Sequence, residues 1–175
     1  MTKNISEKTL QDLEFTTVLK QVAEFCISGL GKEKALQTIP ISNKKKLFFE
    51  LNLVNEYLSS FENENRIPNH NFDDITESIK RLAIENSFLE TEAFLKIATT
   101  SETVNELKKF LKKFETYYPT HFILSESIEF TTFIIDAIKK IITADGIIAD
   151  NASSVLKQIR KDTHQVRGKI SESFT

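Results

Sequence analysis

Apolar residues recur every three or four positions along most of this chain, which is the spacing of one face of an α-helix. Few residues favour turns, because the 175 residues include only four glycines and three prolines. The β-branched residues do not form alternating runs bounded by turns, as exposed strands would. We therefore predict an all-α protein whose helices are joined by short loops.

The periodicity divides the chain into successive helices. We expect them over 15–26, 32–37, from Ser42 for about six turns of 3.6 residues, from Asp73 to about 84, from about 91 to 117, over about 127–143 and from 153 onward. The break at 28–31 should end the first of these helices. The residues expected to pack the helical core are Leu47, Leu51, Val54, Leu107, Leu111, Ile134 and Ile138.

The last predicted helix has a narrower apolar face than the others. Its apolar positions are spaced three, four, three and four, which is the seam of a coiled coil. These positions are Leu156, Ile159, Thr163, Val166 and Ile170. Either Asp150 or Ser153 can cap the helix. We expect residues 1–152 to form a helical core domain and residues 153–175 to begin a longer helix that continues past Thr175.

No segment carries a known catalytic or nucleotide-binding motif. The nearest approach to a phosphate-binding loop is Gly31-Lys32-Glu33, where an acid replaces the Ser or Thr that would meet magnesium. The sequence has neither a G-x-S-x-G elbow nor an H-E-x-x-H pair. Its histidines, which are far apart, are expected on the surface or in loops: His70, His121 and His164. We predict no catalytic, cofactor-binding or metal-binding residues in this chain.

The sequence also indicates a cytoplasmic location. Cys26 is the only cysteine, so an intramolecular disulfide is impossible, which fits a reducing compartment. The N-terminus has no hydrophobic signal region, and no run approaches the roughly 18 apolar residues of a membrane span.

Charge is balanced over the chain but not along the last helix. The 23 basic and 25 acidic residues give a net charge of −2, which argues against a polycation that coats nucleic acid. From Ser154 to Thr175, however, five basic residues meet only Asp162 and Glu172. Such a helix can neutralise phosphates, although a solvated helix face explains the same charges. The candidate nucleic-acid contacts are Lys157, Arg160, Lys161 and Arg167.

One segment has enough characteristic residues at fixed spacing to be a family signature. It reads Asp145-Gly146-x-Ile148-x-Asp150-x-Ala152-Ser153-x-x-Leu156-x-x-Ile159-Arg160. With Leu13-Glu14-Phe15, Leu30-Gly31-Lys32-Glu33 and Pro68, it resembles the N-terminal part of bacterial MutS paralogues of the second type, an endonuclease family within the MutS mismatch-repair superfamily. The resemblance covers nearly the whole chain. Asn71-Phe72 and Asn86-Ser87 stand where the family usually has paired glycines, and both departures fall in predicted loops.

The resemblance implies a helical core of MutS type that leads into a lever helix and a nucleic-acid clamp. It also implies an ATPase that binds ATP and magnesium and forms a homodimer, and a small nuclease domain, all beyond Thr175. The chain itself would then be no enzyme and would hold no cofactor. The partners implied for the whole protein are branched or structured DNA, with suppression of recombination, and the collided ribosome.

These implications lead to a mechanical function. We expect the chain to be a non-catalytic core and lever that couples the ATPase to the clamp. The alternative is a self-contained helical module that binds a partner helix along the apolar seam of the last helix.

Overall fold

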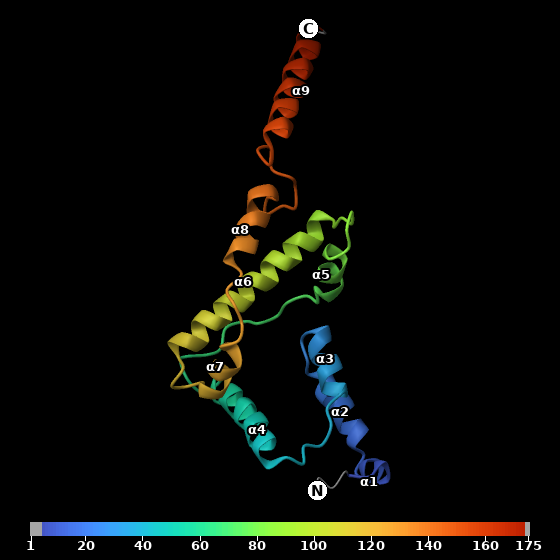
Figure 1. Cartoon of the computed structure of the whole chain (residues 1–175), viewed down its shortest axis with the longest axis vertical. Coiled ribbons are helices and arrows are strands. Elements are labelled where there is room, and N and C mark those ends of the chain that lie inside the picture. The colour runs from blue at the N-terminus through green and yellow to red at the C-terminus, as the bar shows by residue number, and fades with distance from the viewer. Residues whose placement is uncertain (1–4, 174–175) are drawn as a thin grey trace. The chain divides into compact units, whose positions relative to one another are not determined.

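The computed structural model describes residues 5–173, which form helices and no strands (Figure 1). The predicted all-α fold is confirmed. The helices are α1 Glu7–Asp12, α2 Phe15–Glu24, α3 Gly29–Leu36, α4 Lys44–Ser59, α5 Thr76–Leu82, α6 Thr91–Lys113, α7 Pro119–Ser125, α8 Thr132–Ile141 and α9 Ser154–Ser173. No helix among these residues is both long enough and apolar enough to cross a bilayer.

The ends of the first helices differ from the sequence prediction. Gly29 and Gly31 begin α3 instead of ending α2, because the Ser28 hydroxyl accepts a hydrogen bond from the Gly31 amide at 3.1 Å. In the same way Asn43, and not Ser42, caps α4 by accepting from the Lys46 amide at 3.0 Å. Helices α1 and α7 were not predicted.

Contacts between residues divide the chain into two units. The first comprises the residues up to Asp74 together with Glu102–Phe130, and the second comprises Ile75–Ser101 together with the segment from Thr131 onward. Residues 1–152, predicted to be one core domain, thus contribute to both units. The domain boundary after residue 152 stays a prediction.

The second unit has a hydrophobic cluster between α6 and α8. Its buried members are Ile97, Ala98, Ile138 and Ile142. The predicted core residue Ile138 is therefore confirmed, and Ile134 is half-buried against the same cluster. Because α6 and α8 each present apolar residues at intervals of three or four, they bury one stripe each.

The first unit is built around Tyr118, whose side chain is fully buried. Its hydroxyl donates to the Asn65 carbonyl oxygen and lies 3.4 Å from Asn63 Oδ1, so the buried polar group is satisfied. The predicted core residue Leu111 is buried and Leu107 is half-buried.

The core prediction for α4 is wrong. Leu47, Leu51 and Val54 are 38%, 52% and 56% exposed. The helix instead turns Glu56 and Ser60 inward, and both side chains are buried. Burying a carboxylate is costly unless it is hydrogen-bonded, so the partners of Glu56 explain which face of α4 packs.

Glu56 receives its hydrogen bonds from the first turn of α7. Its Oε1 accepts from the Thr120 backbone amide at 2.8 Å, and its Oε2 accepts from the His121 amide at 3.1 Å and lies 2.9 Å from His121 Nδ1. Amides in a first turn have no partner within their own helix. The carboxylate therefore caps α7 from another helix, and His121 is a largely buried partner of Glu56, not the surface or loop residue expected.

The same contacts set the acidity of Glu56. Burial alone would raise the pKa of its carboxyl, but hydrogen bonds from Thr120 and His121 outweigh burial and hold the pKa below its usual value. The stabilisation is complete above the ordinary carboxyl pKa of about 4.3 and is lost as pH falls through the lower folded-state pKa.

We predict that Glu56→Gln destabilises the chain by about 1–3 kcal/mol at pH 7, because the amide replaces a charged acceptor. The loss of stability on acidification should also become smaller. Urea unfolding at pH 7 and pH 3 measures both effects, with exposed Glu62→Gln as the matched control. An acid dependence in Glu56→Gln equal to that of the parent chain would show that another group titrates.

Candidate nucleic-acid interface

A tight loop in the second unit leads from α8 to α9. Ile142 and Ile148 form an isolated antiparallel bridge, and the Thr143 amide donates to the Ile147 carbonyl at 2.8 Å. Gly146 turns the loop with a φ of +76°, a conformation that favours glycine. A methyl group at Gly146 would meet Leu95 only at an ordinary contact distance of 3.5 Å, so its conformation, and not a lack of space, explains the glycine.

Ser153 starts α9. Its hydroxyl accepts a hydrogen bond from the Leu156 amide at 3.1 Å, and its carbonyl accepts from the Lys157 amide at 3.0 Å. Of the two residues that the sequence offers as a cap, Ser153 is the one that makes this contact. Asp150 makes a different contact, an ion pair with Arg160.

Arg160 fastens α9 to the loop before it. Its Nη1 donates to the Ile148 carbonyl oxygen at 3.1 Å and to a carboxylate oxygen of Asp150. The Arg160 side chain is 35% exposed. Its guanidinium therefore holds the helix in place. This structural role was not predicted from the sequence, which indicated Arg160 only as a candidate phosphate contact.

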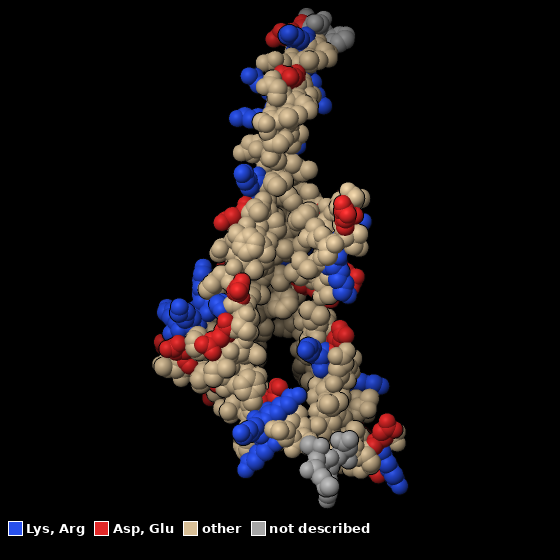
Figure 2. All heavy atoms as spheres, in the orientation of Figure 1, with Lys and Arg blue, Asp and Glu red and all other residues tan. Residues whose placement is uncertain are grey.

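The four proposed contact residues lie on one face of α9. At about 100° per residue, Lys157, Arg160, Lys161 and Arg167 fall within roughly 120° of the helix circumference. Lys157, Lys161 and Arg167 are exposed, and the exposed His164, which was not among the predicted contacts, lies on the same face. Figure 2 shows mostly Lys and Arg among the charged side chains along α9. We call these five residues the basic face.

The coiled-coil seam predicted for α9 lies beside the basic face. Ile159, Val166 and Ile170 are all more than half exposed. A hollow of about 480 Å³ lies along the seam, lined by Ile159, Asp162, Thr163, Val166 and Arg167. The helix thus presents a basic face and an adjoining apolar face to other molecules, with Arg167 at the border between them.

The basic residue Lys108 in α6 has a structural role. Its Nζ donates to the carbonyl oxygens of Ser125 at 3.0 Å and Glu126 at 3.4 Å and to that of Ile128. These carbonyls lie at and after the end of α7, where helix carbonyls lack partners. Because they are 17–20 residues from Lys108, no local sequence pattern marks this contact.

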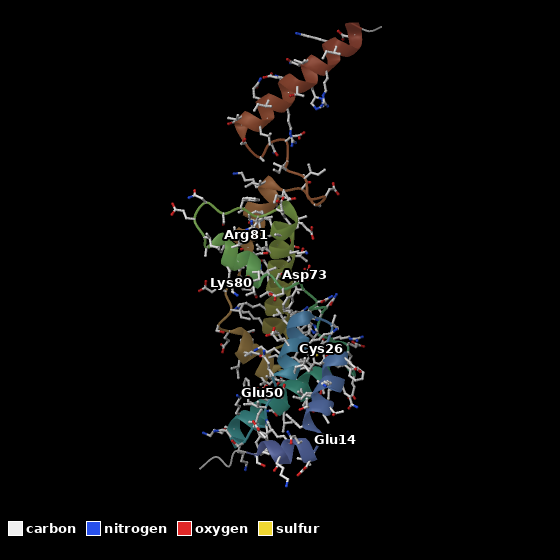
Figure 3. All side chains as sticks on the ribbon, turned by 90° about the vertical axis from the view of Figure 1, so that its right-hand side faces the viewer. Glu14, Cys26, Glu50, Asp73, Lys80 and Arg81 are labelled. Carbon is white, nitrogen blue, oxygen red and sulfur yellow. The ribbon has the colours of Figure 1, made fainter. Side chains whose placement is uncertain are left out.

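His70 and Cys26 make local contacts. His70 Nδ1 lies 3.1 Å from the Pro68 carbonyl oxygen. The half-buried Cys26, labelled in Figure 3, lies just after α2, and its thiol donates to the Val22 carbonyl oxygen at 3.6 Å. Within residues 5–173, no three His, Cys, Asp or Glu side chains are close enough to hold a metal ion.

The chain is similar to proteins named Endonuclease MutS2. No family model matches it. The MutS2 of Alkaliphilus oremlandii is 28% identical over 98% of this chain and 22% of its own length, and that of Caldanaerobacter subterraneus is 30% identical over the same shares. The MutS2 of Aquifex aeolicus is 27% identical over 95% of this chain and 21% of its own length. The chain thus spans about a fifth of these relatives, and the resemblance indicated by its motifs is confirmed.

We predict that Ser153→Ala loosens the first turn of α9. Loss of an N-cap costs about 0.5–2 kcal/mol, which corresponds to roughly 2- to 30-fold faster exchange of the Leu156 amide. Hydrogen exchange measures this rate, and Ser154→Ala removes a neighbouring hydroxyl that is not the cap. Equal exchange rates in the two variants would contradict the capping role of Ser153.

Proposed function

We propose, since the chain is related to the MutS2 family over nearly its whole length, that it acts as a non-catalytic helical core and lever of a MutS-like DNA-binding protein. In this proposal, ATP and magnesium binding, nuclease chemistry and ATPase dimerisation belong to other parts of a longer protein. Movement of the ATPase reaches the nucleic-acid clamp through the helices described here. Packed helices suit this task because they move as bodies and do not deform continuously.

The basic face of α9 is the observation that carries the proposal. Lys157 and Arg167 are ten residues apart, or about 15 Å along a helix axis, and the phosphates of one DNA strand are spaced about 3.4 Å along the duplex axis. The helix can therefore contact more than one phosphate. Arg160 contributes by fixing α9 to the loop between α8 and α9, so that a load on the helix is passed to that loop.

Branched DNA is the target that we propose. Its junction brings several phosphate backbones together, which favours a protein surface with clustered cations. Ribosomal RNA in a collided ribosome offers the same phosphate chemistry and is the alternative target. Suppression of recombination would follow from binding to branched intermediates.

A helical protein-interaction module is the second candidate function, favoured by the exposed seam of α9. A partner helix would pack on Ile159, Val166 and Ile170 by knobs-into-holes contacts. The seam and the basic face are centred roughly 120° apart on the helix. A partner in the seam would approach Arg167, which lines the hollow there, but would leave Lys157 and Lys161 open, so substitutions of these two lysines can separate the two functions.

We predict that the chain binds branched DNA at low salt and that Lys157→Ala, Lys161→Ala and Arg167→Ala together weaken the binding. If each residue neutralises one phosphate, the slope of log K against log salt should fall in magnitude by about 2.7. Fluorescence anisotropy with branched and linear DNA at several salt concentrations measures the affinity and the slope.

The matched control removes three exposed lysines from the first unit, Lys20, Lys32 and Lys34, also by alanine substitution. This variant has the same net charge as the α9 variant. We expect it to keep the affinity and the salt slope of the parent chain. Equal losses in the two variants would mean that net charge, and not the basic face, determines binding.

A further inference from the structure

Helix α4 has two opposite faces with different surroundings. One face, which includes Glu56 and Ser60, is buried in the first unit. At about 100° per residue, the opposite side of the helix carries a row of large apolar residues that are each 38–58% exposed. They are Leu47, Leu51, Val54, Leu58 and Phe61, and we call this row the α4 seam.

The α4 seam has the geometry of a helix-pairing surface. Its residues are spaced four, three, four and three, which is the repeat by which two helices pack knobs into holes. Contiguous exposed apolar surface of this kind marks an interaction site, whereas single exposed apolar residues are common on any protein. The row begins at the fourth residue of α4, Leu47, and ends one residue after the cap, Ser60.

Charge at the two ends of α4 indicates what covers the seam. Lys44, Lys45 and Lys46 form the first turn. Glu62 and Glu64 follow the last turn together with Arg66, which lies over the Phe61 ring, so that end keeps a net negative charge. A second α4 packed in the same direction would place lysines beside lysines. Packed in the opposite direction, it would place lysines near glutamates at both ends and would align the two helix dipoles favourably.

We propose that two copies of this chain pair through their α4 seams in antiparallel orientation. Antiparallel seams place Leu47 opposite Leu58 of the second copy and Leu51 opposite Val54 of the second copy. In this orientation the basic end of each helix meets the acidic end of the other. The same surface is therefore used by both copies, as a twofold interface requires. This interface is distinct from the basic face of α9 and from the ATPase dimer proposed for the longer protein.

Disulfide cross-linking in a Cys26→Ser background tests the pairing and its direction. We expect no cross-linked dimer from Leu47→Cys alone or Leu58→Cys alone. In either case the thiol of one copy and the identical thiol of the second copy would be offset by 11 residues, or about 16 Å, along the helix axis. An equimolar mixture of the two variants should yield a mixed disulfide dimer, since the paired positions are then within bonding reach.

Two controls make the test specific. A mixture of Leu47→Cys with Ile123→Cys, an exposed position on α7, should give no dimer. Adding Leu51→Glu to both members of the productive pair should abolish the mixed dimer, whereas Ile123→Glu should leave it intact. Circular dichroism should show unchanged helix content, because Leu51 is exposed.

Charge reversal supplies an independent measurement. Lys44→Glu with Lys46→Glu should lower the dimer fraction in sedimentation experiments, and adding Glu62→Lys with Glu64→Lys should restore it. A Leu47→Cys homodimer would overturn the antiparallel arrangement. A monomer in sedimentation together with no cross-link in any mixture would overturn the interface itself.

Discussion

A single buried carboxylate determines how the first unit packs. Glu56 accepts hydrogen bonds from the first turn of α7 through both of its oxygens, and a buried carboxylate without such partners would be strongly destabilising. The requirement fixes the rotation of α4 about its axis. It also explains why a helix with a leucine-rich stripe turns that stripe outward, and hence why the chain presents a surface suited to helix pairing.

A second set of polar contacts defines the end of the second unit. Ser153 satisfies the first amides of α9, and Arg160 reaches back to Ile148 and Asp150. These contacts tie a helix with little buried surface to the loop before it. The basic residues of α9 therefore differ in their surroundings, because Arg160 anchors the helix while Lys157, Lys161 and Arg167 remain exposed to solvent. An anchored base and an outer surface that can bind are the two properties that the proposed lever function would need.

The spacing of apolar residues was sufficient to predict where the long helices lie in the sequence, but not which face of each helix is buried. It predicted α6, α9 and the burial of Leu111 and Ile138, because three-and-four spacing directly reports a helical stripe. It could not reveal that α4 packs by its polar face. The partners of Glu56 lie 64 and 65 residues away, and those of Lys108 lie 17–20 residues away, so no local pattern connects them. Long-range polar contacts therefore account for most of what sequence analysis missed, including the pairing of His121.

Nucleic-acid binding by the basic face of α9 is the proposal on which the function assigned to this helix depends. Backbone amide NMR spectra, recorded during titration with branched DNA at low salt, test it most directly. We expect the largest chemical-shift changes on residues 157–168 of α9 and small changes along α4. Changes concentrated on α2 to α4, or no changes at all, would contradict it.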